Sequence, residues 1–343
     1  MPPSEPSGIR LSHAYYDEVV QPLLAERFPG MPYAAGRLGA GSDVLELDDD
    51  MSRDHDWGLR LSLFVPDDVV DAVDGLLERM LPATFCEHPT RFAFTGETEA
   101  RHRIEVTTLE RFLDARLGFD PRHGVSVDDW LSLTGQAALE VTAGPLFADA
   151  TGELGRARDA LRWYPQDLWR YVIACDWARL AQELPLAGRA GDRGDERGSR
   201  VIASRLSQIA MHLAFMLERR WPPYSKWFGT LFGRLGSASE LGPAIDRALE
   251  ADTWGARQAA LAEALAVLLR VQNRLGLTSV EPATVQFWDR PYLHPNPAIV
   301  TRLLDGITDP EVSALPLGRG TIEQRTDNVD VLVNPSMRRT AAR

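Results

Sequence analysis

The chain has 343 residues, of which 44% are hydrophobic and 25% charged, and its formal net charge is −12 at pH 7. This length predicts two domains in a globular protein, and the acidic balance argues against binding to nucleic acid or to an anionic membrane. The sequence has no run of 18 apolar residues and no basic and apolar leader, so we expect neither a transmembrane helix nor a signal peptide. Its two cysteines, Cys86 and Cys175, are too few for a disulfide framework, which favours a cytoplasmic location.

Helices and strands are expected to alternate over the first 120 residues, because apolar residues there recur at helical spacing or at period two. We expect helices at residues 12–28, 66–80 and 109–117, and strands at residues 33–38, 57–65, 91–94 and 102–107. Ser12 is a candidate N-cap for the first helix. Residues 43–52 are too acidic for a core element. Within them, Asp48 to Asp50 are interpreted as solvated loop acids, while Asp43 either joins them or holds the turn before it.

The sequence pattern becomes mainly helical after residue 120. We expect helices at residues 128–134, 153–162, 165–184, 199–220, 226–235, 240–250 and 254–275, with a polar, glycine-rich loop at 187–200 and irregular chain after Val280. The predicted fold is therefore an α/β (α+β) head with a mixed sheet, followed by a mainly α-helical domain. The predicted boundaries are 1–120 for the catalytic head, 121–305 for the substrate-binding domain and 306–343 for an irregular tail.

Two aspartates at the start of a predicted strand are the first candidates for chemistry. Asp54 and Asp56 are two residues apart, so an extended chain places both on one face and His55 on the other. Glu105, on another predicted strand, supplies a third carboxylate. Such hard oxygen ligands suit Mg²⁺, and two ions can stabilise both oxygens of an in-line displacement. The alternative is an Asp-rich loop that is only solvated.

The order of these residues resembles the signature of the polymerase-β-like nucleotidyltransferases. In that signature a Gly-Ser turn, here Gly41-Ser42, is followed by a spacer, an Asp-x-Asp pair and a third carboxylate on a neighbouring strand. The chain also resembles the DUF4037 family, which combines such a head with a helical C-terminal domain. This second resemblance extends over residues 12–335 and rests on the segments GSDVLELDDDMSRDHDWG, AGRAGDRGDERGS, PPYSKW and FWDRPY.

The resemblance implies a role for each matching residue. Asp54 and Asp56 would hold two Mg²⁺ ions, while Glu105 would hold the catalytic ion and could also act as a base toward the acceptor hydroxyl. Gly41 and Ser42 would contact the triphosphate of ATP or another NTP. The remaining nucleotide-binding candidates are Arg53, which either pairs with Asp54 or reaches a phosphate, and Lys226. Lys226 is the only lysine among the 37 basic residues, and it either contacts the triphosphate or is a surface charge.

The residues that would select the acceptor are less defined. Asp195, Glu196 and Arg200 in the polar loop are candidates for substrate contacts or are simply solvated. Asp289 and Arg290, in an aromatic segment, either line an acceptor pocket or belong to a packing cluster.

The function implied by the resemblance is transfer of NMP, with AMP from ATP favoured, to a hydroxyl of a small molecule with release of pyrophosphate. Two alternatives stay open. The acceptor is a hydroxyl of a protein, or the chain is a nucleotide-binding regulatory module without turnover.

Overall fold

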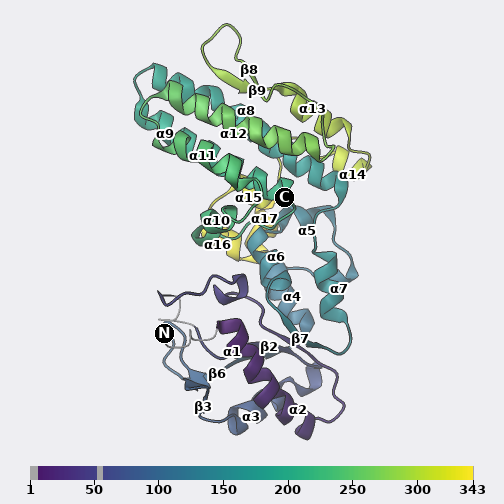
Figure 1. Ribbon diagram of the computed structural model, residues 1–343. Coiled ribbons are helices and arrows are strands. Elements are labelled where there is room, and N and C mark those ends of the chain that lie inside the picture. Colours follow the sequence, from purple (N-terminus) through teal and green to yellow (C-terminus); the bar gives the residue numbers. More distant parts are fainter. Residues whose placement is uncertain (1–6, 52–56, 343) are drawn as a thin grey trace. The chain divides into compact units, whose positions relative to one another are not determined.

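The computed structural model describes residues 7–51 and 57–342. The chain divides into two compact units (Figure 1). Unit 1 comprises Met1–Val125 and Ala137–Arg162, and unit 2 comprises Ser126–Gln136 and Trp163–Arg343. The catalytic and substrate-binding roles of residues 1–120 and 121–305 stay predictions. Within the described residues, no helix combines the length and the apolar character that a membrane span needs.

A mixed five-stranded sheet forms the centre of unit 1, as predicted. Its strands, in spatial order, are β5 (Arg91–Phe92), β6 (Arg101–Thr107), β2 (Arg60–Phe64), β1 (Ala34–Gly36) and β7 (Leu146–Asp149). β2 and β6 are parallel, and the other three pairings are antiparallel. β7 was not predicted, because its four half-buried residues lack an alternating pattern.

Helices cover both faces of this sheet. The helices of unit 1 are α1 (Gly8–Tyr15), the π-helical turn η1 (Tyr16–Val20), α2 (Gln21–Arg27), α3 (Val70–Met80), α4 (Leu109–Leu117), α6 (Gly135–Thr142, in unit 1 from Ala137) and α7 (Glu153–Ala160). Leu61 and Leu63 of β2 share one buried core with α1, η1, α2 and α3. On the opposite face, Phe64 packs edge-on against Phe112 of α4 at 4.7 Å. The first helix begins earlier than expected because its N-cap is Ser7, not Ser12.

A buried ion pair shapes the turn after β1. The guanidinium of Arg37 donates to both carboxylate oxygens of Asp43, at 2.7 and 2.8 Å, and both side chains are almost fully buried. Arg37 also donates to the carbonyl oxygens of Leu38 and Ala40. The expectation that residues 43–52 lie outside the core is therefore wrong for Asp43, which Arg37 neutralises. Asp43 is therefore not a solvated loop acid but holds the turn, the second of its two predicted roles.

Asp48 also has a structural role, which corrects its interpretation as a solvated loop acid. One carboxylate oxygen accepts hydrogen bonds from the backbone N–H of Gly8, at 2.8 Å, and from the indole of Trp57, at 3.3 Å. Asp48 thereby joins the start of α1 to the chain just before β2.

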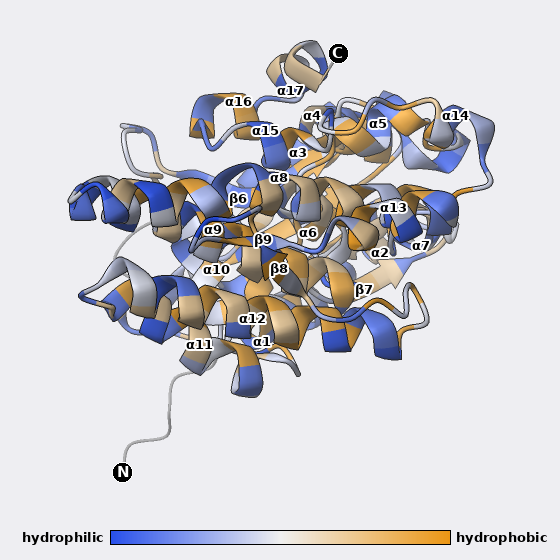
Figure 2. Cartoon of the chain, turned by 90° about the horizontal axis from the view of Figure 1, so that it is seen from above, coloured by the Kyte–Doolittle hydropathy of each residue, from blue (hydrophilic) through white to orange (hydrophobic). Residues whose placement is uncertain are grey.

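Unit 2 is a bundle of helices. Its longer helices are α8 (Gln166–Asp192), α9 (Glu196–Leu217), α11 (Ala238–Glu250) and α12 (Trp254–Arg274), and α8, α9 and α12 pack against one another. Figure 2 shows polar and apolar residues alternating around these helices. In the interior, the indoles of Trp169 and Trp177 donate to the carbonyl oxygen of Met216 and to the side chain of Gln272.

The predicted loop at residues 187–200 is wrong, because α8 continues to Asp192 and α9 begins at Glu196. The glycines of this segment allow close packing. A Cβ on Gly191 would lie 2.2 Å from the Cβ of Trp254, and one on Gly188 would lie 2.9 Å from the ring of Tyr292. Glycine inside a helix therefore indicates here the close approach of a neighbouring aromatic side chain.

The prediction of irregular chain after residue 280, including the tail 306–343, is also wrong. Short elements fill this region: β8 (Thr284–Gln286), β9 (Leu293–Pro295), α13 (Pro297–Asp305), α14 (Pro310–Ser313), α15 (Ile322–Arg325), α16 (Val329–Val333) and α17 (Pro335–Ala342). Two further short helices of unit 2, α5 (Val127–Ser132) and α10 (Ser225–Phe232), lie earlier in the chain. Helices of four or five residues are too short to show a period. They begin at side-chain caps such as Asp309 and Asn328.

The Arg37–Asp43 pair makes Gly41→Ala the most informative change in the turn. A Cβ on Gly41 would lie 2.3 Å from Oδ1 of Asp43 and 2.4 Å from Nη2 of Arg37. Because breaking a buried ion pair is costly, we expect Gly41→Ala to lower the free energy of unfolding by about 3 kcal/mol in chemical denaturation.

Gly124→Ala is the matched control, since Gly124 has a positive φ, of 103°, as Gly41 does at 146°, but has open space around it. It should cost only about 1 kcal/mol of backbone strain. Equal losses for the two variants would contradict the proposed role of the ion pair.

Candidate functional site

Three of the predicted site residues, Arg53, Asp54 and Asp56, lie outside the described residues. The described chain resumes at Trp57, whose indole donates to Asp48 at 3.3 Å. Gly8 packs between this indole and Asp43, since a Cβ on Gly8 would be 2.9 Å from Nε1 of Trp57 and 2.9 Å from Cβ of Asp43.

Glu105 lies on β6 and faces α4. Its register partner on the parallel strand β2 is Ser62. Nη2 of Arg116, in the last turn of α4, donates to both oxygens of Glu105, at 3.2 and 2.9 Å. The side chain of Glu105 is 42% exposed and that of Arg116 19% exposed, so this ion pair is open to solvent.

The same arginine also lies against the glycine turn. A Cβ on Gly39 would be 3.1 Å from Nη2 of Arg116, and Gly39 has a φ of 78°, which favours glycine. A second arginine, Arg60 at the start of β2, approaches the turn at Gly41, where a Cβ would be 3.3 Å from its Nη1. Unit 1 therefore brings together the glycine turn, two arginines and Glu105.

Ser42 closes the turn through its backbone. Its carbonyl oxygen accepts the N–H groups of Leu45 and Leu47, at 3.1 and 2.9 Å, and it precedes the short 3₁₀ helix η2 (Asp43–Leu45). The Ser42 side chain is partly exposed. The turn is thus held rigidly, and contact of Gly41 and Ser42 with a phosphate stays a prediction.

The carboxylate chemistry of the site fits Mg²⁺, but Glu105 alone is not a metal site. Among residues 7–51 and 57–342, no three His, Cys, Asp or Glu side chains are grouped to hold a metal ion. A cation at Glu105 would therefore need ligands from outside these residues, and Asp54 and Asp56 are the predicted ones. It would also have to share Glu105 with Arg116, which contacts both of its oxygens.

Lys226 lies in unit 2, in the first turn of α10. It is exposed, and its Nζ is 4.8 Å from the ring centroid of Trp227. Its predicted contact with the triphosphate stays a prediction.

Structural roles account for two of the predicted substrate residues near the start of α9. Asp195 is the N-cap and accepts the N–H of Gly198 at 2.8 Å. Glu196 pairs at 3.0 Å with Arg257, which is buried and also donates to Ser199. Arg200 lies on the surface, 3.7 Å from Asp252.

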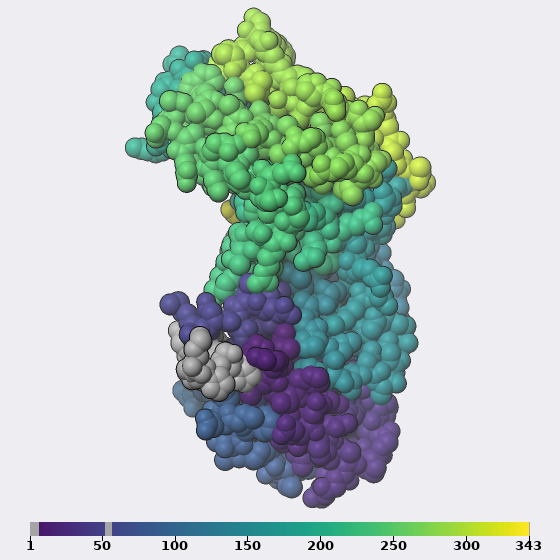
Figure 3. Space-filling view, in the orientation of Figure 1, coloured from purple at the N-terminus to yellow at the C-terminus, as the bar shows by residue number. Residues whose placement is uncertain are grey.

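Asp289 and Arg290 lie in the loop that joins β8 to β9. Both are exposed, as is Trp288, whose side chain is 81% exposed and whose φ is 58°. The β8–β9 hairpin projects from the surface of unit 2 (Figure 3). Tyr292, at the end of this loop, is instead buried and donates to Asp192 at 2.9 Å. The aromatic segment is therefore divided between a packed tyrosine and an exposed tip.

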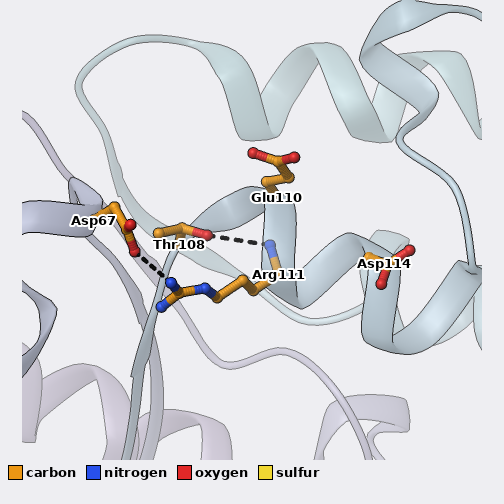
Figure 4. Close-up of a pocket in the computed structure, with 5 residues that line it drawn as sticks. All are labelled: Asp67, Thr108, Glu110, Arg111 and Asp114. Carbon is orange, nitrogen blue, oxygen red and sulfur yellow. Dashed lines mark hydrogen bonds and ion pairs between the residues drawn. The ribbon is translucent and has the colours of Figure 1, made fainter.

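A shallow cavity of about 300 Å³ lies at the C-terminal ends of β2 and β6. Figure 4 shows the five residues that line it: Asp67, Thr108, Glu110, Arg111 and Asp114. Asp67 and Arg111 pair at 2.7 Å, and the hydroxyl of Thr108 caps α4. Among the described residues, the lining of this cavity offers no grouped donor set for a cation.

Unit 2 contains a buried acid–histidine network that no sequence pattern indicated. Nδ1 of His212, on α9, is 2.7 Å from the carboxylate of Asp176, on α8, and both side chains are buried. Glu323, on α15, accepts the backbone N–H of Gly135 at 3.0 Å. The two acids and the histidine are far apart in sequence, so spacing alone could not have linked them.

Burial raises the pKa of Glu323 from 4.5 to about 7, although the nearby charges of His212 and Arg338 and the N–H of Gly135 act in the opposite direction. Burial disfavours the charged form of His212, but attraction to Asp176 and the hydrogen bond between them outweigh it, so the pKa of His212 is raised. The folded protein therefore binds protons at both sites more tightly than the unfolded chain.

This proton binding predicts a stability that falls as the pH rises. A carboxyl whose folded pKa exceeds its unfolded value stabilises below the unfolded pKa, and this contribution is lost as the pH rises through the folded pKa. For Glu323 this contribution is lost between about pH 4.5 and about pH 7, and one pKa unit corresponds to about 1.4 kcal/mol. His212 acts in the same direction, above pH 6.5. We expect the free energy of unfolding to fall by on the order of 3 kcal/mol between pH 5 and pH 8.

Glu323→Gln should remove most of this pH dependence, because the amide keeps an acceptor for Gly135 but does not ionise. Chemical denaturation at both pH values measures the effect. Glu311→Gln, which neutralises an exposed acid on α14, should leave the dependence unchanged. A pH dependence that Glu323→Gln leaves intact would contradict the assignment.

Two comparisons with known proteins gave matches. The crystal structure of a nucleotidyltransferase-like protein from Exiguobacterium sibiricum 255-15 is 13% identical, with 78% of this chain and 75% of that chain covered and a TM-score of 0.32. No curated protein matches the sequence significantly. The model of the DUF4037 family, a domain of unknown function, matches residues 130–228, which include Asp176 and His212. The predicted resemblance to DUF4037 is thus confirmed over these residues, less than a third of the chain.

Proposed function

We propose that the chain is a Mg²⁺-dependent nucleotidyltransferase that moves NMP from an NTP, with ATP favoured, to a hydroxyl of a small molecule. The observation that carries this proposal is that unit 1 brings together the glycine turn, two arginines and Glu105. A glycine turn held by Arg37 and Asp43 lies there next to Arg60 of β2, the strand that follows Asp54-x-Asp56 in the sequence. Glu105, on the strand parallel to β2, is linked to the same turn through Arg116.

In this reaction a bond forms between the acceptor oxygen and the α-phosphorus, and the bond from that phosphorus to the pyrophosphate oxygen breaks. Asp54, Asp56 and Glu105 would hold the metal ions, since their oxygens match the preference of Mg²⁺. Bound Mg²⁺ supplies charge neutralisation at the transferred group and at the leaving pyrophosphate. Glu105 is also placed on a partly exposed surface, where it could take the acceptor's proton.

The turn would position the polyphosphate. Arg37 and Asp43 fix its backbone, so Gly41 and Ser42 need little rearrangement to face a ligand. Lys226, as the only lysine, is a further proposed phosphate contact.

A protein hydroxyl is the second candidate acceptor. The tip of the β8–β9 hairpin exposes Trp288 and Arg290, and tryptophan and arginine are enriched among the residues that dominate protein interfaces. Mass spectrometry distinguishes the two candidates, because a protein acceptor gains the mass of one NMP. Under the favoured proposal the adduct is found on a small molecule.

Asp56→Asn tests the proposed function. We expect the wild-type chain to release pyrophosphate from NTP in the presence of Mg²⁺ and an acceptor. Because the amide is a poor ligand for Mg²⁺, Asp56→Asn should lower the rate by at least a hundredfold. A coupled pyrophosphate assay measures the effect.

Asp68→Asn is the control, because Asp68 is an exposed acid in the turn after β2 and is not part of the proposed site. It should react at the wild-type rate. Turnover that is unchanged in Asp56→Asn would contradict the proposed site. Tight binding of NTP without pyrophosphate release, over a broad panel of acceptors, would instead favour the regulatory module.

A further inference from the structure

The two arginine–carboxylate pairs at the glycine turn differ in how easily they can exchange partners. Arg37 and Asp43 are 2% and 4% exposed and are bonded on several sides, so this pair is fixed. Arg116 and Glu105 are 19% and 42% exposed. Ion pairs that are open to solvent are weak, since water and other ions compete for both partners. Arg116 is therefore the arginine that can change its acceptor.

Several contacts hold Arg116 close to the turn. Its guanidinium carbon is 3.9 Å from the ring centroid of Phe112, which is buried. Its Nε is 3.7 Å from the carboxylate of Glu140, whose carbonyl oxygen accepts the N–H of Gly39 at 2.8 Å. These contacts hold the guanidinium at Cζ and Nε, while Nη2 donates to Glu105. An acceptor on the turn therefore needs only a small movement of Nη2, which already lies 3.1 Å from the position of a Cβ on Gly39.

A cation on Glu105 would compete with Arg116 for the same two oxygens. When a carboxylate binds a divalent ion, its attraction for a neighbouring guanidinium falls, and the guanidinium becomes available to another anion. The turn lies next to both arginines: a Cβ on Gly39 would be 3.1 Å from Nη2 of Arg116, and one on Gly41 would be 3.3 Å from Nη1 of Arg60. A guanidinium matches phosphate oxygens with two parallel N–H groups.

We propose that the Glu105–Arg116 pair is a latch on a polyphosphate site at the Gly39–Gly41 turn. With the latch closed, Glu105 holds Arg116. When a cation occupies Glu105, Arg116 binds the polyphosphate together with Arg60. This inference rests on the proposed function for the nature of the ligand and for the role of Glu105. It adds a regulation of that site, in which metal loading increases the affinity for the anion.

Binding of inorganic tripolyphosphate in EDTA tests the latch without turnover and without metal. Isothermal titration calorimetry should show about tenfold tighter binding for Glu105→Gln, which releases Arg116. Arg116→Gln alone should change the affinity less than about threefold, because Glu105 already holds Arg116 in the metal-free wild type. In the double variant Glu105→Gln/Arg116→Gln, the gain from Glu105→Gln should disappear. Glu105→Gln/Arg116→Lys keeps the charge but loses the fork, so its affinity should lie between those of Glu105→Gln and the double variant.

Two variants of α4 serve as controls. Glu110→Gln removes one negative charge, and Arg111→Gln removes one positive charge that pairs with Asp67. Each should change the affinity less than twofold. If Glu105→Gln still tightens tripolyphosphate binding in the Arg116→Gln background, the gain reflects only the loss of a negative charge. That result would overturn the latch. Wild-type affinity in Glu105→Gln would overturn it as well.

The outcome is distinguishable from failure of the proposed function. Pyrophosphate release that depends on Asp56 can occur even if the double variant overturns the latch. Conversely, a gain in affinity for tripolyphosphate that depends on Arg116 can occur in a chain that does not turn over NTP.

Discussion

The buried ion pair between Arg37 and Asp43 is the constraint on which the candidate site depends. Removing both charges from water is costly, and the cost is offset only because the guanidinium meets two carboxylate oxygens and two backbone carbonyl oxygens. That arrangement leaves no room for a side chain at Gly41. The residue type at Gly41, the burial of Asp43 and the shape of the turn are therefore consequences of one interaction, and none of them requires a ligand.

The buried Arg37–Asp43 pair fixes the backbone beside which the more exposed Glu105–Arg116 pair lies. Because the turn is already rigid, Arg116 and Arg60 approach a defined backbone surface, and a change of partner by Arg116 does not require refolding of the loop. Unit 2 shows a different use of buried charge. There His212 joins α9 to Asp176 of α8, Glu323 of α15 accepts the N–H of Gly135, and burial makes the folded state prefer the protonated acid. The Glu105–Arg116 pair near the turn is partly exposed, whereas the charges in the bundle are buried and are expected to couple stability to pH.

Much of the sheet could be predicted from the sequence, but the polar residues could not. The alternation around Leu61 and Leu63 and the run from His102 to Thr107 predicted strands that the structure contains, because both signals are local. Asp43 and Asp48 were not separable from solvated acids, since their partners Arg37 and Gly8 become neighbours only after folding. The glycines between 187 and 200 predicted a loop, because a sequence does not distinguish a glycine that turns the chain from one that accommodates Trp254. The resemblance to DUF4037 was confirmed for residues 130–228, while the roles of Asp54, Asp56 and Glu105 stay predictions.

The most direct test of the account is a crystal structure of the chain with Mg²⁺ and a non-hydrolysable ATP analogue. The account predicts metal ions on the carboxylates of Asp54 and Asp56, with the triphosphate on the Gly39–Ser42 turn. It also predicts that Arg116 has moved from Glu105 to a phosphate oxygen. A nucleotide bound away from the turn, with no metal on either aspartate, would contradict the central claim.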